Sequence, residues 1–252
     1  MSKISRRKLI TTGLLATAGA TGLGVAAKLA ERYGLIPPDA GVLYGAGETL
    51  TYAAQRLFAR YSLAPEFGRS QISKDPFANP VDPLGAEFQR LQAGGFADWR
   101  LAVDGMVARP TSFSLAELKS FPWSTHITMI ACEEGWSYIA EWSGVPLAHI
   151  LNRVGALPQA RYVVYRSFQP AWWDSIDMAD ALHPQTLLAA GMNGGELPVP
   201  FGGPLRLRIP RQLGYKNVKY ITRLTLTDNL KRFGKGLGSA APEGGYAWYA
   251  GI

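Results

Sequence analysis

The chain has a single cysteine, Cys132, among 252 residues, which excludes a disulfide within the chain. The same scarcity excludes a c-type haem attachment motif, because that motif needs two cysteines and a histidine. The three histidines, His126, His149 and His183, stand at spacings that suit no zinc site. Cys132 is therefore either an inert buried thiol or a thiolate that takes part in chemistry.

Charge is also scarce, since charged residues make up 18% of the chain and the formal net charge is +7. Four basic residues without an acid lie in the first 27 positions: Lys3, Arg6, Arg7 and Lys8. The remainder carries too little net charge to indicate a nucleic-acid partner. An apolar content of 47% excludes a disordered chain. The 28 glycines and 17 prolines indicate many turns in a mixed, β-rich architecture.

Residues 1–27 have the pattern of a targeting segment. The string SRRKLI at residues 5–10 resembles the twin-arginine export motif, and residues 9–27 form a weakly hydrophobic run rich in Ala, Gly and Thr. Small residues at 25–27 suit cleavage. We predict a twin-arginine signal segment at 1–27 that the twin-arginine translocase recognises for export to the periplasm. An uncleaved leader that retains the protein at a membrane is the alternative.

The residues around Cys132 predict a strand end. Ile127 to Ile130 form an apolar, β-branched run, after which the chain turns acidic and contains glycine. Rigid scaffolds commonly place reactive groups where a strand runs into a loop. Spacing, capping and turn signals predict further helices at 50–58, from 114, at 146–154, 179–182 and 184–190, strands at 99–103, 162–165 and 204–210, and a type I′ hairpin at 192–196.

The string Cys-Glu-Glu-Gly-Trp-Ser at 132–137, followed by Trp-Ser-Gly-Val-Pro-Leu at 142–147, resembles the molybdopterin-dependent sulfite oxidase family. More narrowly it is similar to the exported branch that includes the catalytic subunit of periplasmic methionine-sulfoxide reductase. The resemblance covers roughly residues 72–252. It implies an α+β, β-rich molybdopterin-binding fold with short helices and long loops, and one pterin per molybdenum with Cys132 as the single protein ligand. A soft thiolate suits such a metal.

The resemblance also implies which residues hold the pterin and its phosphate. In the family this role falls to an arginine and a short basic segment, which here are Arg206 and Lys216-Asn217-Val218-Lys219. The residues themselves suit a phosphate, because arginine binds it bidentately and lysine binds it as a point charge. Alternation along 204–210 places Arg206 and Arg208 on one face and the leucines on the other. A solvated basic face is the alternative.

Three further positions are weaker carry-overs from the family. Asn79 and Ser167 match cofactor contacts, although a turn-forming asparagine before Pro80 and an exposed serine are the plain alternatives. Phe201 stands where relatives typically have histidine or asparagine, so one polar contact is expected to be missing. Trp172 and Trp173 are predicted in a loop, as channel walls or as lid packing.

The predicted organisation is an N-terminal arm at 28–90 that wraps a molybdopterin-binding catalytic domain at 91–252. We expect a monomer, since no dimerisation domain of the sulfite oxidase kind is recognisable. With one cysteine and no haem motif, electrons are expected from another protein, a membrane or a soluble cytochrome.

The predicted function is an exported molybdenum oxidoreductase that catalyses two-electron oxygen-atom transfer on a small substrate. Relatives that oxidise sulfite have an Asn-Arg-Arg-like run after the cysteine, whereas this chain has Glu133 and Glu134, which repel an anion. We therefore predict reduction of a neutral S-oxide. The alternatives are a sulfite dehydrogenase-like enzyme, a non-catalytic exported cofactor-binding module, and a thiol enzyme with Cys132 as nucleophile.

Overall fold

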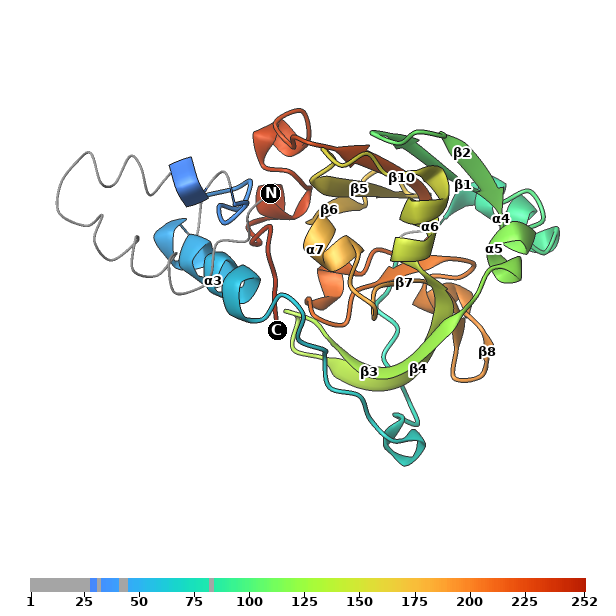
Figure 1. The fold of residues 1–252 in the computed structure, drawn as a ribbon. Coiled ribbons are helices and arrows are strands. Elements are labelled where there is room, and N and C mark those ends of the chain that lie inside the picture. Colours follow the sequence, from blue (N-terminus) through green and yellow to red (C-terminus); the bar gives the residue numbers. More distant parts are fainter. Residues whose placement is uncertain (1–27, 31–32, 41–44, 82–83) are drawn as a thin grey trace, which may run out of the picture.

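Two β-sheets form the body of the protein (Figure 1). The computed structural model describes residues 28–30, 33–40, 45–81 and 84–252, so the predicted signal segment lies outside the described residues. The first sheet has the order β2-β1-β10-β5-β6 and the second has β3-β4-β7-β8, with β9 paired to β7. Only β1 and β10 pair in parallel among the described strands. The predicted α+β, β-rich class is confirmed.

The bounds of the elements show short helices between the strands. The strands are β1 (Arg100–Gly105), β2 (Thr111–Ser114), β3 (Ser124–Ala131), β4 (Ser137–Pro146), β5 (Tyr162–Ser167), β6 (Trp173–Asp177), β7 (Leu187–Met192), β8 (Gly195–Glu196), β9 (Arg206–Arg208) and β10 (Ile221–Thr227). The helices are α3 (Gly45–Phe58), α4 (Gly85–Ala93), α5 (Leu115–Ser120), α6 (Leu147–Val154) and α7 (Met178–Ala181), with 3₁₀ turns η1 (Arg69–Gln71), η2 (Val199–Phe201), η3 (Gly214–Lys216), η4 (Gly234–Gly236) and η5 (Ala241–Gly244).

Local signals explain where several elements begin and end. Ser114 accepts a hydrogen bond from the Glu117 amide, and the Glu117 carboxylate accepts one from the Ser114 amide, so the predicted capping box starts α5. Helix α6 ends at Gly155, whose φ of 68° is left-handed. Asn193 and Gly194 have φ values of 50° and 81° between β7 and β8, which confirms the predicted hairpin.

Two local predictions are wrong. The helix predicted at 184–190 is largely strand β7, whose residues are all buried. A strand covered on both faces has a continuous apolar run without alternation, and such a run resembles a buried helix in sequence. Trp173 belongs to β6 and not to a loop, because β6 pairs with β5 from Arg166↔Trp173 onward.

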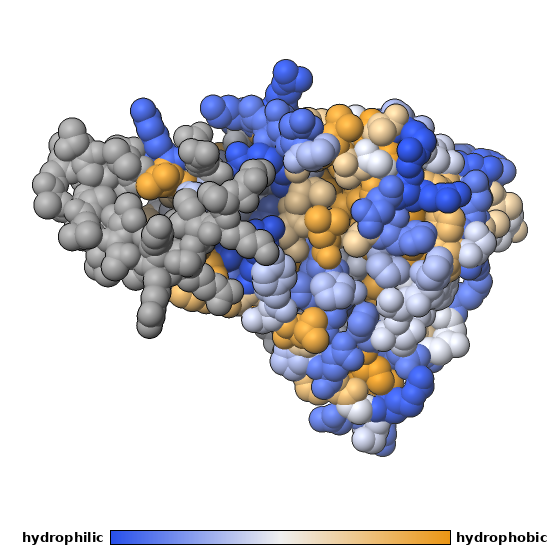
Figure 2. Space-filling view, viewed as in Figure 1, coloured by the Kyte–Doolittle hydropathy of each residue, from blue (hydrophilic) through white to orange (hydrophobic). Residues whose placement is uncertain are grey.

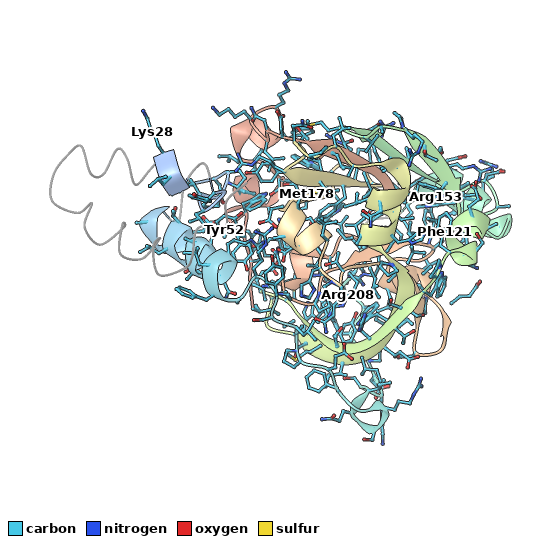
Figure 3. The ribbon with its side chains drawn as sticks, viewed as in Figure 1. Lys28, Tyr52, Phe121, Arg153, Met178 and Arg208 are labelled. Carbon is cyan, nitrogen blue, oxygen red and sulfur yellow. The ribbon has the colours of Figure 1, made fainter. Side chains whose placement is uncertain are left out.

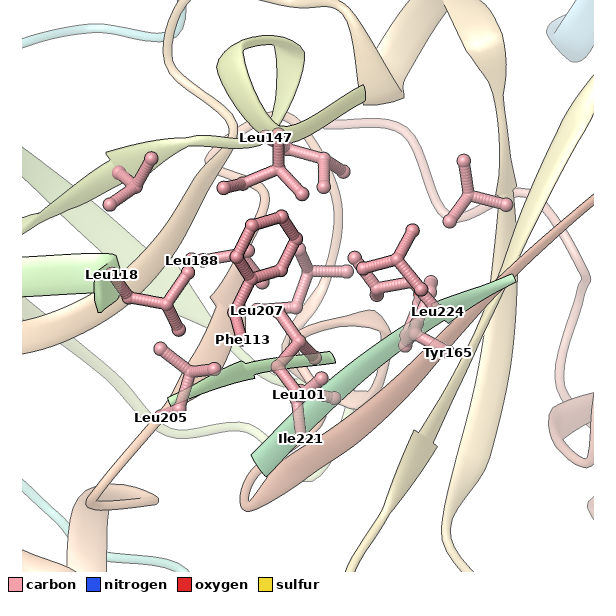
Figure 4. Packing of buried hydrophobic residues seen from close by; sticks show 14 of the residues in the cluster. Leu101, Phe113, Leu118, Leu147, Tyr165, Leu188, Leu205, Leu207, Ile221 and Leu224 are labelled. Atoms are coloured by element: carbon pink, nitrogen blue, oxygen red, sulfur yellow. The ribbon is translucent and has the colours of Figure 1, made fainter. Parts of the chain in front are cut away.

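The main core fills the space between the two sheets (Figure 4). Leu147 of α6 belongs to this core together with Phe113 and Leu101 of the first sheet and Leu188 and Leu207 of the second. Leu205, Leu207 and Ile209 are all buried here, as the alternation along 204–210 predicts. Phe88 and Leu91 of α4 belong to the same core. The predicted boundary between residues 90 and 91 therefore falls inside α4, a helix that packs in this core.

The surface gives no broad hydrophobic face on the side shown in Figure 2, where hydrophobic residues form small groups among hydrophilic ones. Within the described residues, no helix combines the length and the apolar character needed to cross a membrane.

Helix α3 lies to one side of the sheets and is tied to them by buried charges (Figure 1). Arg56 Nε lies 2.6 Å from Asp177 Oδ2, and Arg56 Nη2 lies 2.6 Å from Asp180 Oδ2. Tyr52 donates a hydrogen bond of 2.8 Å to Asp177. Arg211 of the core donates to the carbonyls of Ala59 and Arg60 just after the helix. These contacts fix the start of the N-terminal arm.

We expect Arg56→Ala to lower the free energy of unfolding by about 3–5 kcal/mol, because removing one partner leaves buried carboxylates without a counter-charge. Denaturant unfolding followed by circular dichroism measures the change. The matched control is Arg60→Ala, since Arg60 is exposed and only covers the Tyr61 ring, and it should change stability by about 0.5 kcal/mol or less. Equal stability of the two variants would contradict a stabilising role for the buried ion pairs of Arg56.

Candidate active site

Cys132 sits in a tight turn between β3 and β4. The Cys132 amide donates to the Trp136 carbonyl at 2.9 Å, and the Gly135 amide donates to the Cys132 carbonyl at 3.1 Å. Ala131 pairs with Ser137, so the strand register fixes the turn on both sides. Gly135 has a φ of 93°, a conformation that favours glycine. The predicted placement of the cysteine at a strand end is confirmed, and its side chain is half-buried.

A cavity of about 470 Å³ opens beside Cys132. This volume is within the range of small-molecule sites. Its walls come from segments far apart in the chain, from the arm at 77–81 to the C-terminal residues at 240–246. Seven of the predicted site residues line it: Asn79, Cys132, Ser167, Arg206, Asn217, Val218 and Lys219. Lys216 is the predicted site residue that does not.

The Lys216 side chain is buried away from the cavity. Its ammonium nitrogen donates to Asp174 and to the carbonyls of Ser175 and Trp248, the last two at 2.7 and 2.8 Å. These three bonds use all three donors of the ammonium. The ammonium therefore has no donor left for a phosphate, and the Lys216 amide is also used, in a hydrogen bond to the Leu213 carbonyl.

Arg206 is buried at the cavity wall and has no carboxylate partner among the described residues. Its two terminal nitrogens each donate a 2.7 Å bond, one to the Phe201 carbonyl and one to the Asn217 carbonyl. Its Nε atom is buried without a hydrogen-bond partner. Burial lowers the pKa of Arg206, although arginine stays charged in proteins. These contacts exclude the alternative of a solvated basic face.

The turn after β9 lines the cavity and contains free backbone donors. The Asn217 side chain is fully used inside the turn, because Oδ1 accepts from Arg208 and the Ile209 amide while Nδ2 donates to two carbonyls. The Val218 and Lys219 amides donate to no acceptor in the described part of the chain. Adjacent free amides beside cationic side chains suit the oxygens of a phosphate.

Lys219 joins the arm to the core. Its Nζ atom donates to the Asn79 carbonyl at 2.8 Å and to the Pro200 carbonyl at 2.7 Å, which leaves one of three N–H donors for an anion. Burial, and secondly the charge of Arg206, lower the pKa of Lys219 to about 7. Ser167 is also buried, and its hydroxyl accepts from the Gln169 amide, which excludes an exposed serine.

The cysteine lies in surroundings that favour its protonated form. Burial raises the pKa of Cys132 to about 12, and Glu133 and Glu134 add to the rise. The thiol lies 3.0 Å from the Glu133 carboxylate and 3.8 Å from that of Glu134. A nucleophilic cysteine needs the opposite, a lowered pKa. A bound metal cation deprotonates a thiol outright, so this cysteine suits a metal ligand better than a nucleophile.

Two further residues shape the cavity, and sequence reasoning missed one of them, Tyr138. Gly214 lies so close to the cysteine that a Cβ atom there would stand 3.1 Å from Cys132 Sγ. Tyr138 lines the cavity, stacks on Trp136 with centroids 5.8 Å apart, and meets Phe201 edge-on. The signal for Tyr138 was present, because Tyr138 and Ala140 alternate along β4 and lie in one apolar cluster, against which Trp136 packs.

The metal–pterin group of the resembled family fits these residues. One cavity of suitable size is lined by Cys132, whose surroundings do not suit a nucleophile, and by Arg206, which has no carboxylate partner among the described residues. Val218 and Lys219, with two free amides and one free ammonium donor, line the same cavity. The family model of the oxidoreductase molybdopterin binding domain matches residues 90–232. The chain belongs to this family. It is therefore a molybdopterin-dependent oxidoreductase.

Named relatives agree with this assignment. The chain is 38% identical over 195 residues to the YedZ1 protein of Azospira oryzae, provisionally named a protein-methionine-sulfoxide reductase subunit, covering 77% of this chain and 70% of the relative. It is 34% identical over 147 residues to the protein-methionine-sulfoxide reductase catalytic subunit MsrP of Xanthomonas campestris, covering 52% of this chain and 46% of that one.

A solved structure shares the fold. The sulfane dehydrogenase SoxCD from Paracoccus pantotrophus superposes with a TM-score of 0.51 at 26% sequence identity, over 53% of this chain and 39% of that chain. The chain thus spans less than half of MsrP and of the SoxCD chain. The predicted sulfite-oxidase-type fold is confirmed.

We expect Cys132→Ser to lose most of the molybdenum from the purified protein, because a neutral hydroxyl is a poor ligand for a soft metal. Elemental analysis per chain measures the loss. Ser137→Ala is the control in the same turn, since Ser137 is exposed, and it should keep the wild-type metal content. Full molybdenum in Cys132→Ser would show that the ligand assignment is wrong.

We expect the cofactor to leave faster as the pH rises above 7. With protein groups alone around it, the pKa of Lys219 is about 7. An anion raises that pKa, so binding takes up a proton above pH 7 and weakens by up to about tenfold per pH unit. The release rate at pH 7 and pH 9 measures this dependence.

The control is Lys219→Arg, which stays charged across this range and should show a flat pH profile. Lys219→Gln should release the cofactor quickly at both pH values. A wild-type profile as flat as that of Lys219→Arg would rule out Lys219 as the titrating contact.

Proposed function

We propose that the protein reduces a neutral S-oxide, with methionine sulfoxide as the leading substrate. The names of the relatives from Azospira and Xanthomonas support this substrate class. The observation that carries the proposal is the pair of carboxylates beside the metal-binding sulfur, because Glu133 and Glu134 both lie within 4 Å of Cys132 Sγ. Such a pair repels sulfite and leaves an uncharged sulfoxide unaffected.

Aromatic side chains around the cavity support the same substrate. Phe77, Trp172 and Tyr246 line it and are 47%, 53% and 40% exposed, so they form its solvent-facing rim. Phe77 also packs on Trp136, with ring centroids 5.4 Å apart. Sulfur in a methionine side chain makes favourable contacts with aromatic rings. The rim therefore offers binding energy to a thioether or sulfoxide and little to a small hydrated anion.

The overall reaction is reduction of the sulfoxide by two electrons and two protons to the sulfide and water. When bound, the molybdenum–pterin group supplies the two-electron oxygen-atom exchange. The chain's own residues anchor that group through Cys132, Arg206, Lys219 and the Val218 amide. The aromatic rim positions the substrate, and the arm at 77–81 covers one side of the cavity.

We propose that the protein works outside the cytoplasm and receives electrons from a second protein. The twin-arginine motif at residues 5–10 supports export of a folded, cofactor-loaded chain. The relatives' names, subunit and catalytic subunit, support a partner. The sequence has no haem attachment motif, so a membrane or soluble cytochrome is a suitable donor.

We expect the purified holoprotein to convert methionine sulfoxide to methionine with a reduced dye as electron donor, and to leave sulfite unoxidised with an artificial acceptor. Trp172→Ala should raise KM for methionine sulfoxide roughly twofold to tenfold with little change in kcat, because a sulfur–aromatic contact is lost. Product analysis by chromatography measures turnover.

The matched control is Trp123→Ala, because Trp123 is also exposed, at 39%, and lies outside the cavity. Its KM should equal that of the wild type. Turnover of sulfite without turnover of methionine sulfoxide would favour a sulfite dehydrogenase-like enzyme. A protein with full molybdenum and no turnover of either would favour the non-catalytic cofactor-binding module.

A further inference from the structure

Arg208 is a buried cation to which the sequence assigned no role. It is fully buried and has no carboxylate partner among the described residues. Figure 3 shows it in the interior, above the β3–β4 strands. Isolated buried charges are costly unless they are well hydrogen-bonded. The hydrogen bonds of Arg208 must therefore offset the cost of burying its charge.

Those contacts join two walls of the active site. One terminal nitrogen of Arg208 donates to Asn217 Oδ1 at 2.9 Å. The other donates to the Met129 carbonyl at 2.6 Å and to the Thr128 hydroxyl at 3.1 Å. Met129 lies on β3, three residues before Cys132. Asn217 belongs to the turn that presents the Val218 and Lys219 amides.

The planar guanidinium makes this connection rigid. Its nitrogens are held in one plane, so bonds from both ends fix the separation and the orientation of β3 and the turn. Both guanidinium groups also contact the Trp142 ring, whose centroid lies 5.1 Å from Arg206 Cζ and 5.5 Å from Arg208 Cζ. Arg208 is thus held in place from a third side.

We propose that Arg208 is a positioning residue that sets the distance between the metal-binding cysteine and the turn that holds the pterin. The inference rests on the assignment of Cys132 and of the 217–219 turn to the cofactor. Movement of β3 relative to the turn would move the Cys132 sulfur, which would hold the metal, relative to the residues that would hold the pterin. The metal centre's spectrum should therefore report on Arg208, although Arg208 does not line the cavity.

The test compares Arg208→Met and Arg208→Lys with the wild-type holoenzyme. Each is assayed for molybdenum and pterin per chain and for the electron paramagnetic resonance spectrum of the partly reduced protein. We expect Arg208→Met to keep less than half of the wild-type cofactor and to show shifted g values. Arg208→Lys keeps the charge and loses the fork, so its g values should also shift, with less cofactor lost.

Two controls separate positioning from general destabilisation. Arg223→Met removes an exposed guanidinium paired with Asp104 on the other sheet and should leave the spectrum unchanged. Arg56→Met removes a buried guanidinium whose printed partners, Asp177 and Asp180, lie on neither β3 nor the 217–219 turn, and it should lower the melting temperature without changing the g values.

The inference is overturned if Arg208→Met carries wild-type cofactor with a wild-type spectrum. Should Arg208→Met fail to fold, Arg208→Lys decides by the same criterion. It is also overturned if Arg56→Met shifts the spectrum as much as the Arg208 variants, because the shift would then report only lost stability. A wild-type protein without molybdenum would contradict the cofactor assignment itself. That result is different from a failure of the Arg208 inference, which requires a wild-type protein that holds the cofactor.

Discussion

The thiol of Cys132 must lose its proton before it binds a metal, and its surroundings oppose that loss. Burial and two neighbouring carboxylates raise its pKa to about 12. A thiolate there forms only when a strong positive charge arrives with it, which a metal cation supplies. The site therefore distinguishes a metal ligand from a free nucleophile by electrostatics alone. The glutamates that favour the protonated thiol are the same groups that repel an anionic substrate.

Two other charged side chains of the cavity are positive, in contrast to the carboxylates beside Cys132. Arg206 and Lys219 line it, and neither has a salt-bridge partner among the described residues. Carboxylates near the sulfur and unpaired cations around the 217–219 turn match a ligand that is positive at its metal and negative at its phosphate. Neither group of charges is neutralised by the other within the protein. The cavity is thus preorganised for a ligand with both kinds of charge, so little reorganisation is needed on binding.

Much of this arrangement was predictable because the signals are local. The strand before Cys132, the capping box at Ser114 and the Asn193–Gly194 hairpin each depend on a few neighbouring residues. The positions of Arg206 and Lys219 at the cavity followed from family resemblance. The burial of Lys216 could not be predicted, since its counter-ion, Asp174, lies 42 residues away in the sequence.

The brace made by Arg208 was unpredictable for the same reason. The alternation along β9 predicts on which face of the strand Arg208 lies. It does not predict which residues cover that face. Its partner Met129 accepts through a backbone carbonyl 79 residues away, and a carbonyl has no sequence signature. Strand β7 shows the complementary limit, because burial of both faces removes the alternation that identifies a strand.

The site also depends on completion of the whole fold. The arm contributes Asn79, whose carbonyl accepts from Lys219, 140 residues further along the chain. The C-terminal segment contributes Tyr246, whose ring lies 5.2 Å from that of Tyr215 next to the cysteine turn. The complete cavity therefore exists only in the folded chain. A route that carries folded proteins, as we propose here, meets this physical condition.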